Sequence, residues 1–170
     1  MDQKTINEGN YFSDLEGLRI AIDMEERGHA FYRSAYDHSA DAAQKALFAK
    51  LASDEAQHLR QFTELYQEVK TKSGSDGDEY LFDADFSKYL TALTAPHIFP
   101  KHKEITLNLA GKNAAEILNL AIHDEKEAVL FYDALAQNAK FDNTRKIFET
   151  LKREEQTHIV KLNELLAGLS

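Results

Sequence analysis

The chain contains two copies of one segment, set 100 residues apart. When residues 15–66 are laid over residues 115–166 without a gap, 13 of the 52 positions are identical. In the first copy these positions are Glu16, Leu18, Ala21, Ile22, Glu25, Phe31, Tyr32, Phe48, Leu51, Glu55, His58, Glu64 and Leu65. A repeat of this length, with the same order of apolar and polar residues, predicts a fold built from two equivalent halves.

Each copy has the residue pattern of two helices. Apolar residues recur every three or four positions, as in Leu15, Leu18 and Ile22, which is the spacing of one helix face. The predicted helices cover about 13–38, 41–70, 113–138 and 141–168. Ser13 and Asn113 each precede a glutamate by three residues, the spacing of a capping box at a helix start. An all-α fold follows.

Short polar turns within each copy predict two helix hairpins, 13–70 and 113–168, because a short connection makes consecutive helices antiparallel neighbours. The connection between the hairpins, 71–112, is long; it contains a predicted short helix at about 83–94 and an extended passage around Pro96 and Pro100. A four-helix bundle with one long crossover fits this order. The 170 residues suit a single domain.

Composition excludes several classes of function. The net charge of −9 is spread along the chain without a stripe of lysine and arginine, so we expect no nucleic-acid partner. The absence of cysteine excludes disulfides, thiol catalysis and iron–sulfur clusters. Residues 1–10 are polar and no run of 18 apolar residues occurs, which predicts a cytoplasmic protein without a membrane partner.

Polar residues interrupt the apolar stripe of every predicted helix at repeated positions. Glu55 and His58 lie three residues apart, so both side chains point to the same side of the second helix. Glu155 and His158 repeat this pair in the fourth helix, and Glu25 and Glu125 repeat a carboxylate in the first and third. One such pair is more often a solvated helix face. Carboxylates that recur on the apolar stripe in both copies instead require partners or metal ions, because an unpaired buried charge is costly.

Four carboxylates and two imidazoles from four helices form the ligand set of a dinuclear carboxylate centre. We assign Glu25 and Glu125 as terminal ligands, one for each metal, and Glu55 and Glu155 as bridging ligands. His58 and His158 then bind one metal each. Oxygen ligands with one imidazole for each metal suit two iron ions, with manganese as the alternative. Four negative charges balance two divalent cations.

Other residues near the ligands have candidate supporting roles. Tyr32 and Tyr132 follow the terminal glutamates by seven residues, about two helical turns, and are expected to hydrogen-bond a ligand carboxylate. Asp54 and Glu154 are candidates to accept the second imidazole proton across the bundle. The alternatives are ordinary packing for the tyrosines and surface ion pairs for the acids.

Some polar residues compete with these assignments. The rivals for the terminal-ligand role are Glu26, Asp124 and Glu127. His97 and His102 flank Pro100 and are candidates for an accessory metal site, although exposed loop histidines are the more common case. His29 and His123 lie near the ligands in sequence, but neither has a histidine at the repeat position, which argues against symmetric ligation.

The motifs resemble those of the rubrerythrin branch of the ferritin-like superfamily. The match lies in Glu25-x6-Tyr32, Glu55-x-x-His58, Glu125-x6-Tyr132 and Glu155-x-x-His158, and it covers both hairpins. The resemblance implies a ferritin-like bundle whose di-iron centre reduces hydrogen peroxide to water or reacts with dioxygen. Rubrerythrins carry a further carboxylate three residues after the third-helix ligand, where this chain has Ala128. Many also carry a cysteine-ligated rubredoxin domain.

Because this chain has no cysteine, its electrons are expected from a separate donor such as a rubredoxin. A homodimer is the expected assembly. Two other functions fit the same residues: a ferritin-type iron-binding or storage protein with ferroxidase activity, and a helical interaction module that binds no metal. Metal content separates the last from the other two, and a hollow shell of many subunits would indicate storage.

Overall fold

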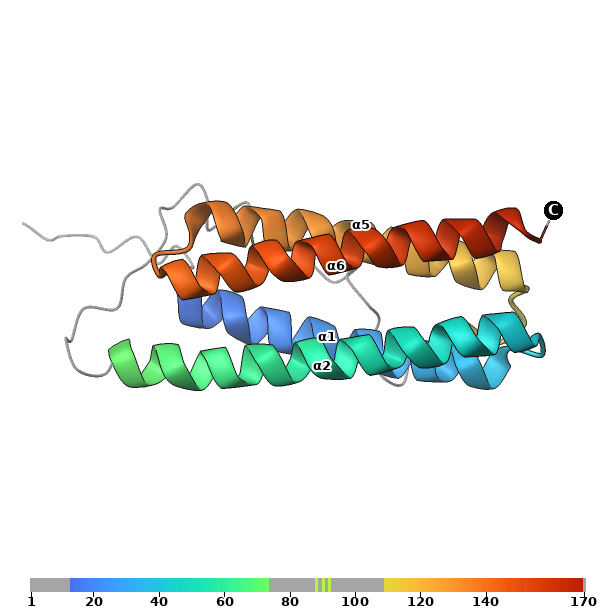
Figure 1. The fold of residues 1–170 in the computed structure, drawn as a ribbon, viewed down its shortest axis with the longest axis horizontal. Helices are drawn as coiled ribbons and strands as arrows, with labels where there is room; N and C mark the ends of the chain where they lie inside the picture. Colours follow the sequence, from blue (N-terminus) through green and yellow to red (C-terminus); the bar gives the residue numbers. More distant parts are fainter. Residues whose placement is uncertain (1–12, 74–87, 89, 91, 93–108, 170) are drawn as a thin grey trace, which may run out of the picture.

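The computed structural model describes residues 13–73, 88, 90, 92 and 109–169. These residues form an all-α four-helix bundle, as the sequence predicts (Figure 1). The helices are α1 (Asp14–His38), α2 (Ala42–Ser73), α5 (Ala114–Asn138) and α6 (Asp142–Ala167). Each boundary lies within three residues of its predicted place, the largest difference being α2, which continues to Ser73 rather than ending near residue 70.

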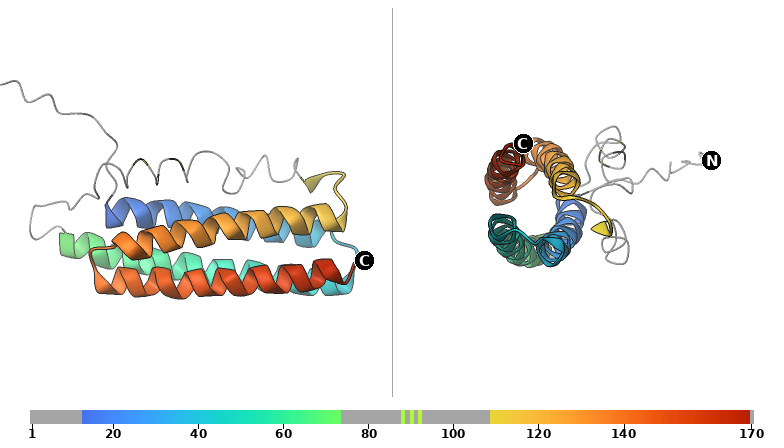
Figure 2. Two further views of the ribbon diagram at one scale, coloured as in Figure 1. Left: turned by 90° about the horizontal axis from the view of Figure 1, so that it is seen from above. Right: turned by 90° about the vertical axis from the view of Figure 1, so that its right-hand side faces the viewer.

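The bundle consists of the two predicted hairpins packed against each other. Helices α1 and α2 form the first hairpin and α5 and α6 the second, while α1 contacts α5 and α2 contacts α6 across the bundle. The end-on view in Figure 2 shows the four helices around a common axis. Helix α2 ends at one end of the bundle and α5 begins at the opposite end (Figure 1). This is the topology of a bundle with one long crossover.

Capping fixes the helix starts where the sequence places them. The Ser13 hydroxyl accepts a hydrogen bond from the Glu16 amide at 3.2 Å. At α5 the capping box is complete. The Asn113 side-chain oxygen accepts a hydrogen bond from the backbone N–H of Glu116, and the Glu116 carboxylate accepts one from the backbone N–H of Asn113. The buried Asp14 carboxylate accepts from the backbone amides before α6. That contact joins the start of α1 to the turn of the other hairpin.

The aromatic core repeats the duplication in three dimensions. Tyr32 stacks on Phe48 with ring centroids 6.1 Å apart and an interplanar angle of 26°. Tyr132 and Phe148 have the equivalent arrangement, at 6.0 Å and 26°. All four rings are at most 1% exposed. The two hairpins therefore share their packing as well as their residue pattern, which places equivalent side chains at equivalent depth in the bundle.

Most of the connection between the hairpins lies outside the described residues. Lys88, Leu90 and Ala92 are helical, within the short helix predicted at about 83–94. The extended passage, with His97 and His102, and the N-terminal segment 1–12 also lie outside them. Within the part of the chain that the structure describes, no helix combines the length and apolar character needed to cross a membrane.

Candidate metal centre

The four helices bring six polar side chains to the middle of the bundle. They are Glu25, Glu55, His58, Glu125, Glu155 and His158, and each is at most 3% exposed. Their helical spacing explains this position, since each lies on the same stripe as the leucines and aromatic residues that form the core. The six residues proposed from the sequence therefore lie together and away from water.

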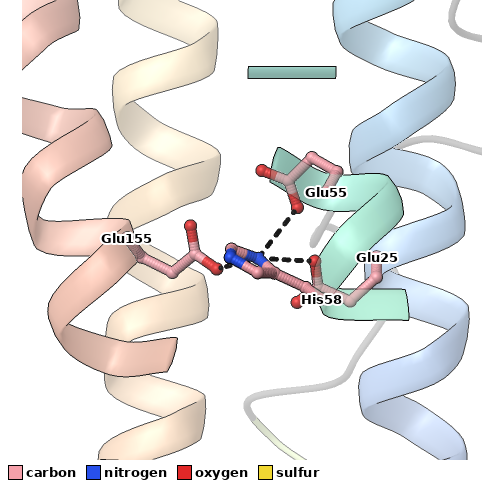
Figure 3. A group of neighbouring side chains, drawn as sticks. All are labelled: Glu25, Glu55, His58 and Glu155. Carbon is pink, nitrogen blue, oxygen red and sulfur yellow. Dashed lines mark hydrogen bonds and ion pairs between the residues drawn. The ribbon is translucent and has the colours of Figure 1, made fainter. Parts of the chain in front are cut away.

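The first group of ligand-type atoms surrounds His58 (Figure 3). Its Nδ1 atom lies 3.0 Å from Glu155 Oε1, 3.2 Å from Glu25 Oε2 and 3.7 Å from Glu55 Oε2. One ligand atom from each of these four residues lies within 4.8 Å of the others. A single cation could reach all four atoms.

A second group surrounds His158 in the same way. Its Nδ1 atom lies 2.8 Å from Glu155 Oε2, 3.3 Å from Glu125 Oε1 and 3.5 Å from Glu55 Oε1. Glu55 and Glu155 belong to both groups, and each turns one oxygen toward each imidazole. This is the placement expected of bridging carboxylates. Glu25 and Glu125 each belong to one group, as terminal ligands would.

The second nitrogen of each imidazole meets an acid of the opposite hairpin. His58 Nε2 lies 2.7 Å from Glu154 Oε2, and His158 Nε2 lies 3.3 Å from Asp54 Oδ2. Both acids are those proposed from the sequence. A carboxylate only accepts hydrogen bonds, so these contacts place a proton on Nε2 and leave Nδ1 to face the centre.

The two tyrosines also cross between the hairpins. Tyr32 donates a hydrogen bond to Glu125 Oε1, and Tyr132 donates to Glu25 Oε1. Both hydroxyls are buried. Each terminal carboxylate is therefore held by a tyrosine of the other half of the molecule. The sequence predicted hydrogen bonds to ligand carboxylates without indicating which glutamate each tyrosine meets.

Comparison with known proteins agrees with this geometry. The family model described as rubrerythrin matches residues 16–107 and 116–170. This chain belongs to the rubrerythrin family. A solved structure from Thermotoga maritima, provisionally described as a ferritin-like diiron-carboxylate protein, has a similar fold with a TM-score of 0.71. The likeness covers 94% of this chain and 98% of the other at 22% sequence identity. No curated protein matches.

In this rubrerythrin-family chain, the six side chains of the centre shift each other's pKa values. Burial, followed by repulsion from Glu55, raises the pKa of Glu25 to about 8. Burial and repulsion from Glu155 likewise raise the pKa of Glu125 well above its usual range. Burial alone would lower the pKa of His58 and His158, but the negative charge of the surrounding carboxylates favours the protonated imidazoles and raises both pKa values above the usual 6.5. The centre therefore retains protons at neutral pH when no cation is present.

Buried polar atoms that lack a hydrogen-bond partner show whether the centre fits metal ions. Among the described residues, five buried side-chain atoms lack a hydrogen-bond partner, and four of them belong to the centre. These four are Glu55 Oε1, both oxygens of Glu155, and His158 Nδ1. The approach of Glu155 to His158 is a charge contact without hydrogen-bond geometry. A buried unsatisfied polar atom is costly. Three of these atoms are carboxylate oxygens and the fourth is an imidazole nitrogen, and this combination of ligand atoms fits iron or manganese ions.

The rival residues do not join either group. Glu26 is exposed and Glu127 is half-buried. Asp124 is buried, and burial raises its pKa to about 6, but its carboxylate pairs with His123 at 3.3 Å. His29 bonds the Ala52 carbonyl instead. Sequence reasoning missed one residue beside the centre, Gly28; an added Cβ there would contact Glu55. A glycine inside a predicted helix, three residues after Glu25, was the available signal.

Proposed function

We propose that this protein is a rubrerythrin-type di-iron protein that reduces hydrogen peroxide or dioxygen. The proposed metal ligands are Glu25, Glu55 and His58 with their repeat partners Glu125, Glu155 and His158. Family membership supports a di-iron centre, and manganese is the alternative metal. The observation that carries the proposal is the pair of overlapping groups, which share two glutamates and no other residue.

The chemistry that two bound ferrous ions would supply is the two-electron reduction of peroxide: H₂O₂ + 2H⁺ + 2e⁻ → 2H₂O. The chain's own residues prepare the site for this chemistry. Glu154 and Asp54 orient the imidazoles through Nε2. Tyr32 and Tyr132 hold the terminal carboxylates. The surrounding aromatic rings exclude bulk water and strengthen every charge interaction at the centre.

Metal content tests the first part of the proposal. Protein produced with iron available should contain about two metal ions per chain, as the ligand set requires. Glu55→Ala should lose metal, because it removes an oxygen from both groups. Glu64→Ala is the matched control, since Glu64 lies on the same helix but is exposed. Less than half a metal per wild-type chain under several loading conditions would contradict the proposal.

Reactivity tests the second part. Diferrous protein is mixed in a stopped-flow instrument with peroxide or with air-saturated buffer, and oxidation is followed by absorbance. Peroxide should react faster; faster oxidation by air would favour an oxidase or ferroxidase. Since the chain has no cysteine, we propose a separate electron donor such as a rubredoxin, tested by reduction of the oxidised centre. We propose a homodimer, and a shell of many subunits in solution would instead favour iron storage.

A further inference from the structure

A glycine lies against one of the proposed bridging carboxylates. Gly28 is buried in the middle of α1, where glycine is a poor helix former compared with alanine. A Cβ added at this position would lie 3.3 Å from both Cδ and Oε2 of Glu55. This is closer than most real Cβ contacts, so the carboxylate would have to move by a few tenths of an ångström. The lack of a side chain lets Glu55 lie against the α1 backbone.

The next residue, His29, joins α1 to α2 by a hydrogen bond close to Glu55. His29 Nδ1 lies 2.7 Å from the carbonyl oxygen of Ala52. Because a carbonyl oxygen only accepts, Nδ1 carries the proton and donates it. Ala52 precedes Glu55 by three residues, about one helical turn. Gly28 and His29 thus fix the helix spacing beside Glu55 in two ways, by close approach and by a direct hydrogen bond.

The second hairpin lacks both features. Its equivalent positions are Ala128 and Val129, and the Ala128 methyl group is buried in the hydrophobic core. Lys152 occupies the position equivalent to Ala52 and pairs with Asp133 at 2.8 Å. The hairpins therefore repeat the proposed ligands while differing in how the helix carrying each bridging carboxylate is held.

We propose that Gly28 and His29 are positioning residues for Glu55 and make the two metal positions unequal. This inference rests on the proposed metal binding. The Glu55 oxygen beside Gly28 is Oε2, which faces His58, whereas Oε1 faces His158. A displacement of Oε2 acts first on the metal position formed with Glu25 and His58. Metal sites depend on ligand placement to within about 0.5 Å, which is comparable with the shift that a methyl group at position 28 requires.

Titration of the metal-free full chain with Co²⁺ alone tests the proposal. Visible absorption reports binding, and thermal melting without metal reports the fold. The wild type should bind two Co²⁺ ions in resolvable steps. Gly28→Ala should weaken one step by about tenfold, the lower end of the effect seen when residues that orient ligands are changed. Its metal-free melting temperature should not fall, because alanine favours the helix.

Two further variants complete the test. Ala128→Gly is the matched control: it should keep both Co²⁺ affinities within the error of the titration and lower the melting temperature. His29→Val, which installs the residue of the second hairpin, should weaken the same step as Gly28→Ala and provides the test if the alanine variant does not fold.

Wild-type Co²⁺ affinities in both Gly28→Ala and His29→Val would overturn the positioning role while leaving the proposed metal centre intact. Equal weakening in Gly28→Ala and Ala128→Gly would overturn the inequality of the two positions. A wild-type chain that binds neither Co²⁺ nor iron would overturn the proposed function, and the positioning role with it.

Discussion

Replacing Tyr132 by phenylalanine should destabilise the metal-free protein although the aromatic ring is retained. The Tyr132 hydroxyl donates to Glu25 across the two hairpins, and both groups are buried. The ring packs against Phe62 at 5.4 Å and Phe148 at 6.0 Å, and phenylalanine keeps those contacts, so no cavity is created. The expected loss is about 1–3 kcal/mol, the cost of leaving a buried acceptor without its hydrogen bond.

Urea denaturation of metal-free protein measures this loss. For a chain of this size, a loss of about 1–3 kcal/mol corresponds to a fall in melting temperature of roughly 2–12 °C. Tyr32→Phe should lose a similar amount, because Tyr32 makes the equivalent bond to Glu125. The half-buried Tyr66 provides the control, and Tyr66→Phe should change stability by less than about 0.5 kcal/mol. If Tyr132→Phe is as stable as the wild type, the bond between the hairpins does not contribute to stability and the reasoning fails.

Three further predictions concern stability. Metal-free Glu55→Ala should be as stable as the wild type or more so, because it removes a buried carboxylate with an unsatisfied oxygen; a loss above about 1 kcal/mol by urea denaturation would contradict this. Metal-free wild type should become less stable as the pH rises from 6.5 to 8. The pKa values of His58 and Glu25 are raised in the folded state, so the folded state holds protons that the unfolded state releases. A urea denaturation midpoint that rises over this pH range would refute the prediction. Asp14→Ala should cost about 0.5–2 kcal/mol through lost amide contacts at the start of α6, measured by thermal melting.

The helices and the central cluster could be predicted because both depend on local spacing. Apolar residues at intervals of three and four define each buried stripe, and Glu55 and His58 share such a stripe whatever the exact packing. The repeat then placed Glu155 and His158 at the same depth. The contact between the helices was predicted from the ligand set of a dinuclear carboxylate centre, which takes residues from all four helices. The repeat therefore carried information on depth in the bundle that one copy alone could not supply.

The glutamate that each tyrosine contacts across the two hairpins could not be predicted in the same way. The partner of Tyr132 depends on how α5 docks against α1, and the sequence does not fix the relative position of two hairpins along the bundle axis. The role of Gly28 was hidden for a related reason, since its neighbour Glu55 belongs to the next helix. Both features arise from tertiary packing. Assignments in the crossover, such as His97 and His102, stay predictions because these residues lie outside the described part.

Charge balance at the centre depends on residues of both hairpins. The four carboxylates carry four negative charges when ionised, and two protonated imidazoles offset only two of them. The raised pKa values of Glu25 and Glu125 remove the remaining imbalance in the metal-free protein by retaining protons. The two divalent cations that we propose, with neutral imidazoles, would give the same balance and would also bind the Glu55 and Glu155 oxygens that lack a hydrogen-bond partner. Because each group of ligand-type atoms contains both Glu55 and Glu155, which lie on different hairpins, neither hairpin contains a complete group alone.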